Sequence, residues 1–254
     1  MGPRLSVLQV SGLSKSFGGV HAVRNVSFAV AAGELLAMIG PNGAGKSTCF
    51  NLINGQFAPD SGRVLLEGRP ITGLPPRAIW RLGVARTFQV TATFASMTVR
   101  ENVQVALLSH ARRLASPVAR APRLQVAQAN ALLAQAGMLD QADRPAAVLA
   151  YGDLKRLELA IALANRPRLL LMDEPTAGMA CGERAALMRL TASLARASAI
   201  AVLFTEHDMD TVFTHADRVI VLADGERIAE GTPAQVRADP RVREAYLGTE
   251  ALDA

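Results

Sequence analysis

Aromatic residues are scarce in this sequence: phenylalanine, tyrosine and tryptophan together make up 4% of its 254 residues. Surfaces that stack nucleic-acid bases are built from such side chains, so their scarcity argues against base binding. The formal net charge of +5 adds little, because the 27 basic and 22 acidic residues are interspersed along the chain. We therefore expect no nucleic-acid partner.

Cysteine and long apolar runs are also nearly absent. Cys49 and Cys181 are the only cysteines, and their spacing matches neither a metal cluster nor a disulfide framework, which fits a reducing cytoplasm. The N-terminal stretch lacks the apolar core of a signal peptide. No uncharged apolar run reaches the length of about 18 residues that a membrane span needs, so we expect any membrane contact to be peripheral.

What the sequence does contain is a hydrophobic share of 50%, enough for a substantial core. Short strand-like segments dominate the first third, and helical patterns dominate residues 77–141, including a Thr98-x-x-Glu101 capping box. From residue 168 onward, strands and helices alternate, which predicts a mostly parallel sheet with ligands at the carboxyl ends of its strands. The expected strands are 7–10, 26–30, 34–40, 63–68, 169–172, 199–204 and 219–223. The expected helices are 98–112, 124–136, 183–197 and 208–216.

A phosphate-binding loop follows the apolar strand at 34–39. The segment GPNGAGKST matches the pattern G-x-x-x-x-G-K-[ST] in full. Glycines let phosphate oxygens reach backbone N–H groups, the lysine neutralises phosphate charge, and the serine hydroxyl suits Mg²⁺. The sequence thus predicts a nucleotide site made of Gly40, Pro41, Asn42, Gly43, Ala44, Gly45, Lys46, Ser47 and Thr48.

A second apolar strand ends in two carboxylates, in the segment RLLLMDEP (168–175). We expect Asp173, at the end of this strand, to hold Mg²⁺ through water. Glu174 follows directly and is placed to orient and deprotonate an attacking water. Because binding alone needs only the first carboxylate, Glu174 favours an enzyme that hydrolyses ATP.

With these motifs in this order, the chain resembles the ATP-binding subunits of ABC transporters almost from end to end. The resemblance implies an α/β cassette of the P-loop NTPase class: a mostly parallel core sheet, an N-terminal antiparallel β subdomain and a helical insertion. It implies a single domain over residues 1–254. Its parts are a core of about 1–89 and 150–254, a helical subdomain of about 90–149 and a C-terminal tail of about 232–254.

The segment LAYGD (149–153) stands where that family has its signature sequence. The resemblance implies that this helix start caps the γ-phosphate held by the other subunit of a sandwich dimer. The residues expected to contact that phosphate are Ala150, Tyr151, Gly152 and Asp153. A helix N-terminus binds anions with its free N–H groups, whichever chain presents it.

Four further positions take roles from the resemblance. Phe17 is expected to stack on adenine, with Val23 as a packing wall; the alternative for Phe17 is core filling. Gln89, in RTFQ, is expected to contact the metal or water and to link to the membrane subunit. His207, in LFTEHDMD, is expected to contact the γ-phosphate as the switch histidine.

Two positions depart from the family pattern. Ala150 replaces the usual signature serine and so removes one hydrogen bond to phosphate, a loss of about 1.5–3 kcal/mol. Ala180 stands where the loop after Glu174 commonly carries Asp or Asn, which puts signalling between the two ATP sites in doubt. These departures keep open the alternative of a catalytically weak nucleotide-binding partner subunit.

The finer resemblance is to the branched-chain amino acid uptake group, through DLKRLELA (153–160), MTV-x-ENV (97–103), TEHDMD (205–210) and REAYLG (243–248). It implies an importer at the cytoplasmic face of the inner membrane. The partners that the resemblance implies are a second similar ATPase, two membrane permeases and a periplasmic binding protein. Docking is expected beside Gln89, with Phe94, Met97 and Val99 as candidate contacts or, alternatively, core residues. A soluble, non-transport ABC ATPase is the remaining alternative.

Overall fold

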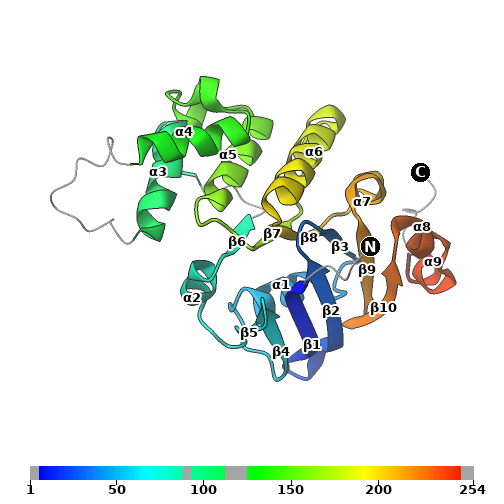
Figure 1. Ribbon diagram of the computed structural model, residues 1–254. Coiled ribbons are helices and arrows are strands. Elements are labelled where there is room, and N and C mark those ends of the chain that lie inside the picture. Colours follow the sequence, from blue (N-terminus) through cyan, green and yellow to red (C-terminus); the bar gives the residue numbers. More distant parts are fainter. Residues whose placement is uncertain (1–5, 88–92, 112–124, 247–254) are drawn as a thin grey trace.

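The computed structural model describes residues 6–87, 93–111 and 125–246. Figure 1 shows two β-sheets packed together, with one group of helices beyond an edge of the larger sheet and two short C-terminal helices beyond the opposite edge.

The smaller sheet is antiparallel and has the order β2-β1-β4-β5. Its strands are β1 (Ser6–Phe17), β2 (Val20–Ala31), β4 (Ser61–Leu66) and β5 (Arg69–Pro70). The first two strands form a long hairpin that extends well beyond the short apolar segments seen in the sequence. Their outer residues are polar, which hides the pattern, and the pairing between the strands sets their length.

The larger sheet has the order β10-β9-β3-β8-β7-β6, in which only the pairing of β10 with β9 is antiparallel. Its strands are β3 (Leu35–Ile39), β6 (Val84–Thr87), β7 (Leu169–Asp173), β8 (Ala201–Thr205), β9 (Arg218–Ala223) and β10 (Glu226–Gly231). The expected mostly parallel core sheet and the antiparallel β subdomain are confirmed.

The helices lie in three regions of the molecule (Figure 1). Those on the flanks of the core are α1 (Lys46–Ile53), α2 (Pro76–Arg81), α6 (Cys181–Ser198) and α7 (Met209–His215). The helical region contains α3 (Val99–His110), α4 (Val126–Gln135), the short η2 (Leu139–Gln141) and η3 (Ala146–Val148), and α5 (Tyr151–Leu163). At the C-terminal end are α8 (Pro233–Ala238) and α9 (Pro240–Tyr246).

Both faces of the larger sheet are covered, which explains the continuous apolar run of β3. Leu36 and Met38 point to the cluster shared with α1 and the smaller sheet, while Leu35, Ala37 and Ile39 point to the cluster under α5, α6 and α7. A third cluster joins α3, α4 and α5. The alternation of side chains along a strand sends successive residues to opposite faces, so a doubly covered strand is apolar throughout.

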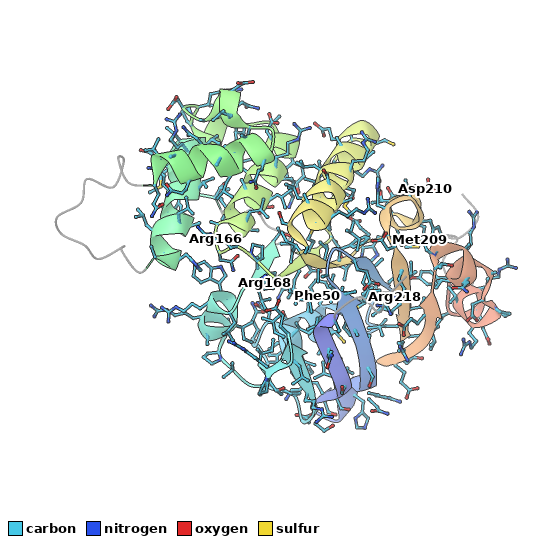
Figure 2. All side chains as sticks on the ribbon, in the orientation of Figure 1. Phe50, Arg166, Arg168, Met209, Asp210 and Arg218 are labelled. Atoms are coloured by element: carbon cyan, nitrogen blue, oxygen red, sulfur yellow. The ribbon has the colours of Figure 1, made fainter. Side chains whose placement is uncertain are left out.

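Side chains also connect the two sheets. Phe50 of α1 is completely buried in the cluster between them. Arg218 of β9, labelled with Phe50 in Figure 2, forms an ion pair with Glu34 at 2.8 Å and donates to the backbone carbonyl of Ala29 on β2. These contacts hold the hairpin against the sheet that carries the phosphate loop.

The interpretation of residues 77–141 as helical was wrong at one point. Val84–Thr87 form β6, the edge strand that pairs in parallel with β7. A strand of four residues gives too short a pattern to stand out among helical segments, and its partner lies about eighty residues further along the chain. The capping box at Thr98 is confirmed, because its hydroxyl accepts from the Glu101 N–H and the Glu101 carboxylate accepts from the Thr98 N–H.

Candidate nucleotide site

The loop between β3 and α1 requires glycine at both ends. Gly40 has φ +152°, and a Cβ built there would lie 2.1 Å from the carbonyl oxygen of Leu222. Gly45 has φ +98°, and its Cβ would lie 2.3 Å from the carbonyl oxygen of Ala22. Both distances are far below van der Waals contact, so no other residue fits without moving the backbone. The glycine positions of the motif are therefore set by the packing of the loop against β2 and β9.

The loop encloses a cavity of about 190 Å³. Lys46, at the first position of α1, is buried, and its Nζ donates to the carbonyl oxygens of Gly40 at 2.6 Å and Pro41 at 3.0 Å. Burial lowers the pKa of Lys46, while the carboxylates of Glu174 and Asp173 partly offset this effect. The cavity is lined by Ala22, Asn42, Gly43, Ala44, Gly45, Lys46, Ser47, Thr48, Glu174 and His207.

Glu174 and His207 meet at this cavity. His207 Nε2 lies 2.8 Å from Glu174 Oε1, and the two residues come from the ends of neighbouring strands, β7 and β8. Glu174 has φ +46°, a conformation that L-residues rarely adopt. Its N–H donates to Thr205 Oγ1 at 3.1 Å, which helps to hold this conformation. A carboxylate and an imidazole beside a phosphate loop are suited to general base chemistry on a water.

Asp173 lies at the end of β7, with both carboxylate oxygens engaged by the protein. Thr205 Oγ1 donates to Oδ1 at 2.8 Å, and Arg86 Nη2 donates to Oδ2 at 2.9 Å. A carboxylate accepts about four hydrogen bonds, so lone pairs remain for a further ligand. Together with the Ser47 hydroxyl, it provides the oxygen donors that Mg²⁺ prefers.

The signature segment starts α5 but lies outside the phosphate cavity. Ala150 is the N-cap, and neither it nor the three residues after it belongs to the cavity lining. Tyr151 is 41% exposed, and a Cβ on Gly152 would lie 2.8 Å from Glu183 Oε1 of α6. Asp153 accepts from Gln141 Nε2 at 3.0 Å. Within one chain, the helix start and the phosphate loop do not form a single pocket.

The remaining candidate residues differ in where the structure places them. Phe17 is 43% exposed and packs edge-on against Phe57 at 5.2 Å between ring centroids, so core filling does not account for it. Val23 is buried, and its Cγ2 would be 3.5 Å from a Cβ on Gly45, which places it directly behind the loop. Gln89 lies outside the described residues. Three residues of the site were assigned no role from the sequence. Ala22 lies in no motif, and Arg86 and Thr205 lie in the segments RTFQ and TEHDMD, where other residues were assigned roles.

A groove of about 530 Å³ lies between the core and the helical region. Phe94, on its rim, is 53% exposed, whereas Val99 is completely buried in the helical cluster. Val99 is therefore a core residue, and its proposed docking role is wrong; Met97 is half-buried. Among the residues lining the groove are Trp80, Arg86, Phe94, Asn102, Val105 and Ile161.

The phosphate loop lies between a parallel strand and a helix, and two carboxylates lie at the end of β7, two positions further along the sheet from β3. This arrangement defines a P-loop nucleotide-binding protein. The family model described as ABC transporter matches residues 23–177, and the chain belongs to the ABC transporter family. A second model, described as branched-chain amino acid ATP-binding cassette transporter, matches residues 226–251.

Known proteins match this sequence over nearly its whole length. The high-affinity branched-chain amino acid transport ATP-binding protein LivG of Escherichia coli is 41% identical over 95% of this chain and 98% of its own length. BraF of Pseudomonas aeruginosa, with the same description, is 40% identical over 95% and 98%. A crystal structure of the ADP conformation of another ATP-binding cassette has a TM-score of 0.86 at 33% identity, covering 96% of this chain and 99% of that one. The crystal structure of a nucleotide-free ATP-binding cassette has a TM-score of 0.84 at 33% identity, covering 95% of this chain and 98% of that one.

Proposed function

We propose that this protein is the ATP-binding and ATP-hydrolysing subunit of an importer for branched-chain or related amino acids. The observation that carries the proposal is the Glu174–His207 pair at the phosphate cavity, because a protein that only binds nucleotide needs neither group. The cargo is inherited from relatives whose names state branched-chain amino acid transport, and the C-terminal family match supports the same group. A soluble, non-transport ATPase is not favoured by these relatives.

The chain's own residues have distinct parts in hydrolysis. Backbone N–H groups of the loop and the start of α1 bind the phosphates, and the Lys46 ammonium turns from the loop carbonyls to phosphate oxygens. Glu174 accepts a proton from the attacking water, and His207 holds the Glu174 carboxylate and contacts the γ-phosphate. Ser47 and Asp173 would hold Mg²⁺, which neutralises developing charge on the phosphates.

The nucleotide is closed off by a second ATP-binding subunit. Because the start of α5 is absent from the cavity of its own chain, its free N–H groups are available for the phosphate of a partner. Exposed Tyr151 and Phe17 then cover opposite ends of the nucleotide, one from each chain. In the full assembly, this chain lies at the cytoplasmic face of the membrane, bound to two integral-membrane permeases that work with a periplasmic binding protein. No helix in the described part of the chain is long and apolar enough to cross a bilayer.

The permeases dock in the groove beside Phe94. Its ring is 53% exposed at the rim of a cavity of about 530 Å³ whose surface is mostly apolar although polar residues also line it. An exposed apolar ring beside such a surface is typical of an interaction site. Phe94→Asp should leave ATP binding intact and uncouple hydrolysis from transport. An equal loss of ATP binding and of transport would point to a folding defect and would remove the support for docking at this groove.

Transport in the host cell tests the proposal as a whole. Deleting the gene should abolish high-affinity uptake of leucine, isoleucine and valine, and the wild-type protein should restore it while Glu174→Gln should not. Fractionation of the cell should find the protein with membranes. Undiminished uptake of all three amino acids would reject the cargo, and recovery with ribosomes would favour the non-transport alternative.

A further inference from the structure

Arg86 of β6 is directly bonded to the carboxylate that we assign to the magnesium site. Its Nη2 lies 2.9 Å from Asp173 Oδ2, and the side chains are 9% and 16% exposed, respectively. An ion pair that is this sheltered from water has a defined geometry and is little screened by salt. Arg86 has no assigned role in the reaction.

The same guanidinium reaches the helix that starts in the phosphate loop. Arg86 Nη1 donates to Asn51 Oδ1 at 2.7 Å, and the guanidinium carbon lies 5.9 Å from the ring centre of Phe50. Asn51 and Phe50 belong to α1, whose second residue is Ser47. Figure 2 shows Phe50 in the centre of the molecule, where α1 is packed between the sheets.

Arg86 therefore connects the two elements that carry the magnesium ligands: α1 with Ser47 and β7 with Asp173. The planar fork of an arginine can bond to two acceptors at once in fixed directions, which the single ammonium of a lysine cannot reproduce. Thr205 holds the other oxygen of Asp173 at 2.8 Å. Because one oxygen is bonded to Thr205 of β8 and the other to Arg86 of β6, rotation of the carboxylate would break both hydrogen bonds.

We propose that Arg86 is a positioning residue of the magnesium site, which fixes Asp173 relative to α1 so that the metal–nucleotide finds its ligands in place. This inference rests on the proposed function, since it assumes that Asp173 receives Mg²⁺. Arg86 also lines the docking groove, so a permease bound there lies beside the residue that holds Asp173.

Magnesium-dependent nucleotide binding provides the test. Binding of a fluorescent ATP analogue to the purified chain is measured at increasing Mg²⁺ concentrations. The wild type is compared with Arg86→Met and Arg86→Lys. Partners of metal ligands typically change metal affinity by about 10- to 100-fold, so Arg86→Met should raise the Mg²⁺ concentration at half-saturation by about tenfold. Arg86→Lys should give a smaller increase. Nucleotide binding without Mg²⁺ should be unchanged in both variants.

Controls separate this role from a general loss of structure. Arg168→Met removes an arginine that is 62% exposed, next to β7, and should behave as the wild type. Thermal unfolding verifies that each variant is folded; if Arg86→Met does not fold, Arg86→Lys decides. A wild-type Mg²⁺ midpoint in the folded variants overturns the inference, as does an equal loss of binding without Mg²⁺. If the wild type itself needs no Mg²⁺, the proposed magnesium site fails instead.

Discussion

His207 Nε2 lies 2.8 Å from Glu174 Oε1, and residues next to them in the chain form a second, buried hydrogen-bonded pair. Glu206, the neighbour of His207, accepts from the N–H of Thr176 at 2.8 Å and from its hydroxyl at 2.7 Å. Thr176 lies two residues after Glu174. The two groups at the cavity are thus connected through their neighbours as well as directly, which favours a single arrangement of both.

Replacing Glu174 with Gln should stop turnover and preserve binding. The amide cannot accept the proton of water, and a general base typically contributes about 10²- to 10⁴-fold to a rate. The rate of phosphate release should therefore decrease by a factor of about 10² to 10⁴. ATP-dependent dimers should accumulate and be detected by size-exclusion chromatography. Glu226→Gln, at a carboxylate 60% exposed on β10, is the matched control. Unchanged phosphate release by Glu174→Gln would remove this residue from the reaction.

Alanine substitutions at two loop glycines should differ in effect. Gly45 and Gly43 both have positive φ, +98° and +82°, but only the Cβ of Gly45 would collide with the backbone, whereas Gly43 faces open space. Strain alone costs about 1–3 kcal/mol, and the collision adds to it. By calorimetry, Gly45→Ala should weaken ATP binding by at least about tenfold more than Gly43→Ala. Similar losses would mean that the loop adapts to the added atom.

Ala150→Ser should stabilise the protein and strengthen the closed dimer. Ala150 is the N-cap of α5, with φ −63° and ψ 156° and no side-chain cap. Serine at such a position stabilises a helix by about 0.5–2 kcal/mol. The free energy of unfolding, measured by urea denaturation, should increase by an amount in this range. Ala147→Ser, at an exposed residue of η3, should show no increase. An Ala150→Ser variant no more stable than the wild type would mean that the helix start is already satisfied.

Stability should respond to pH through Glu206. Its side chain is buried, and burial raises the pKa of Glu206, although the Thr176 hydrogen bonds oppose this. A raised pKa in the folded state means that the stabilising contribution is present below the unfolded value of about 4.3 and is lost as pH rises through the folded value. Above the pKa of the folded state, the folded protein has to keep the charged Glu206 carboxylate buried.

Glu206→Gln keeps an oxygen acceptor for Thr176 and removes the charge. The Tm gain over the wild type should therefore be larger at pH 7 than near pH 4, where the acid is mostly protonated in both states. Exposed Glu226→Gln reports the general effect of losing one negative charge. Equal gains at both pH values would contradict a charge-dependent cost at Glu206.

Local patterns were sufficient for the phosphate loop, the strand before it and the helix after it, because one continuous segment contains all the required residue types. The same holds for the Thr98 capping box and for the apolar strands, whose composition follows from burial on both faces. A helix start near the Tyr-Gly pair was also predictable, because a helical pattern of apolar residues follows from Leu154; the structure begins α5 slightly earlier, at Tyr151.

Contacts between distant segments were decided by the strand order. Val84–Thr87 became an edge strand only by pairing with β7, and that pairing brings Arg86 to Asp173 and Asn51. Likewise, Val99 is buried because α3 packs one face against α4 and α5, whereas Phe94, in the segment before α3, is exposed. A motif records which chemical groups are present in a segment. Which group from another strand or helix lies beside them depends on how the elements pack, and single-sequence periodicity carries no information about that packing.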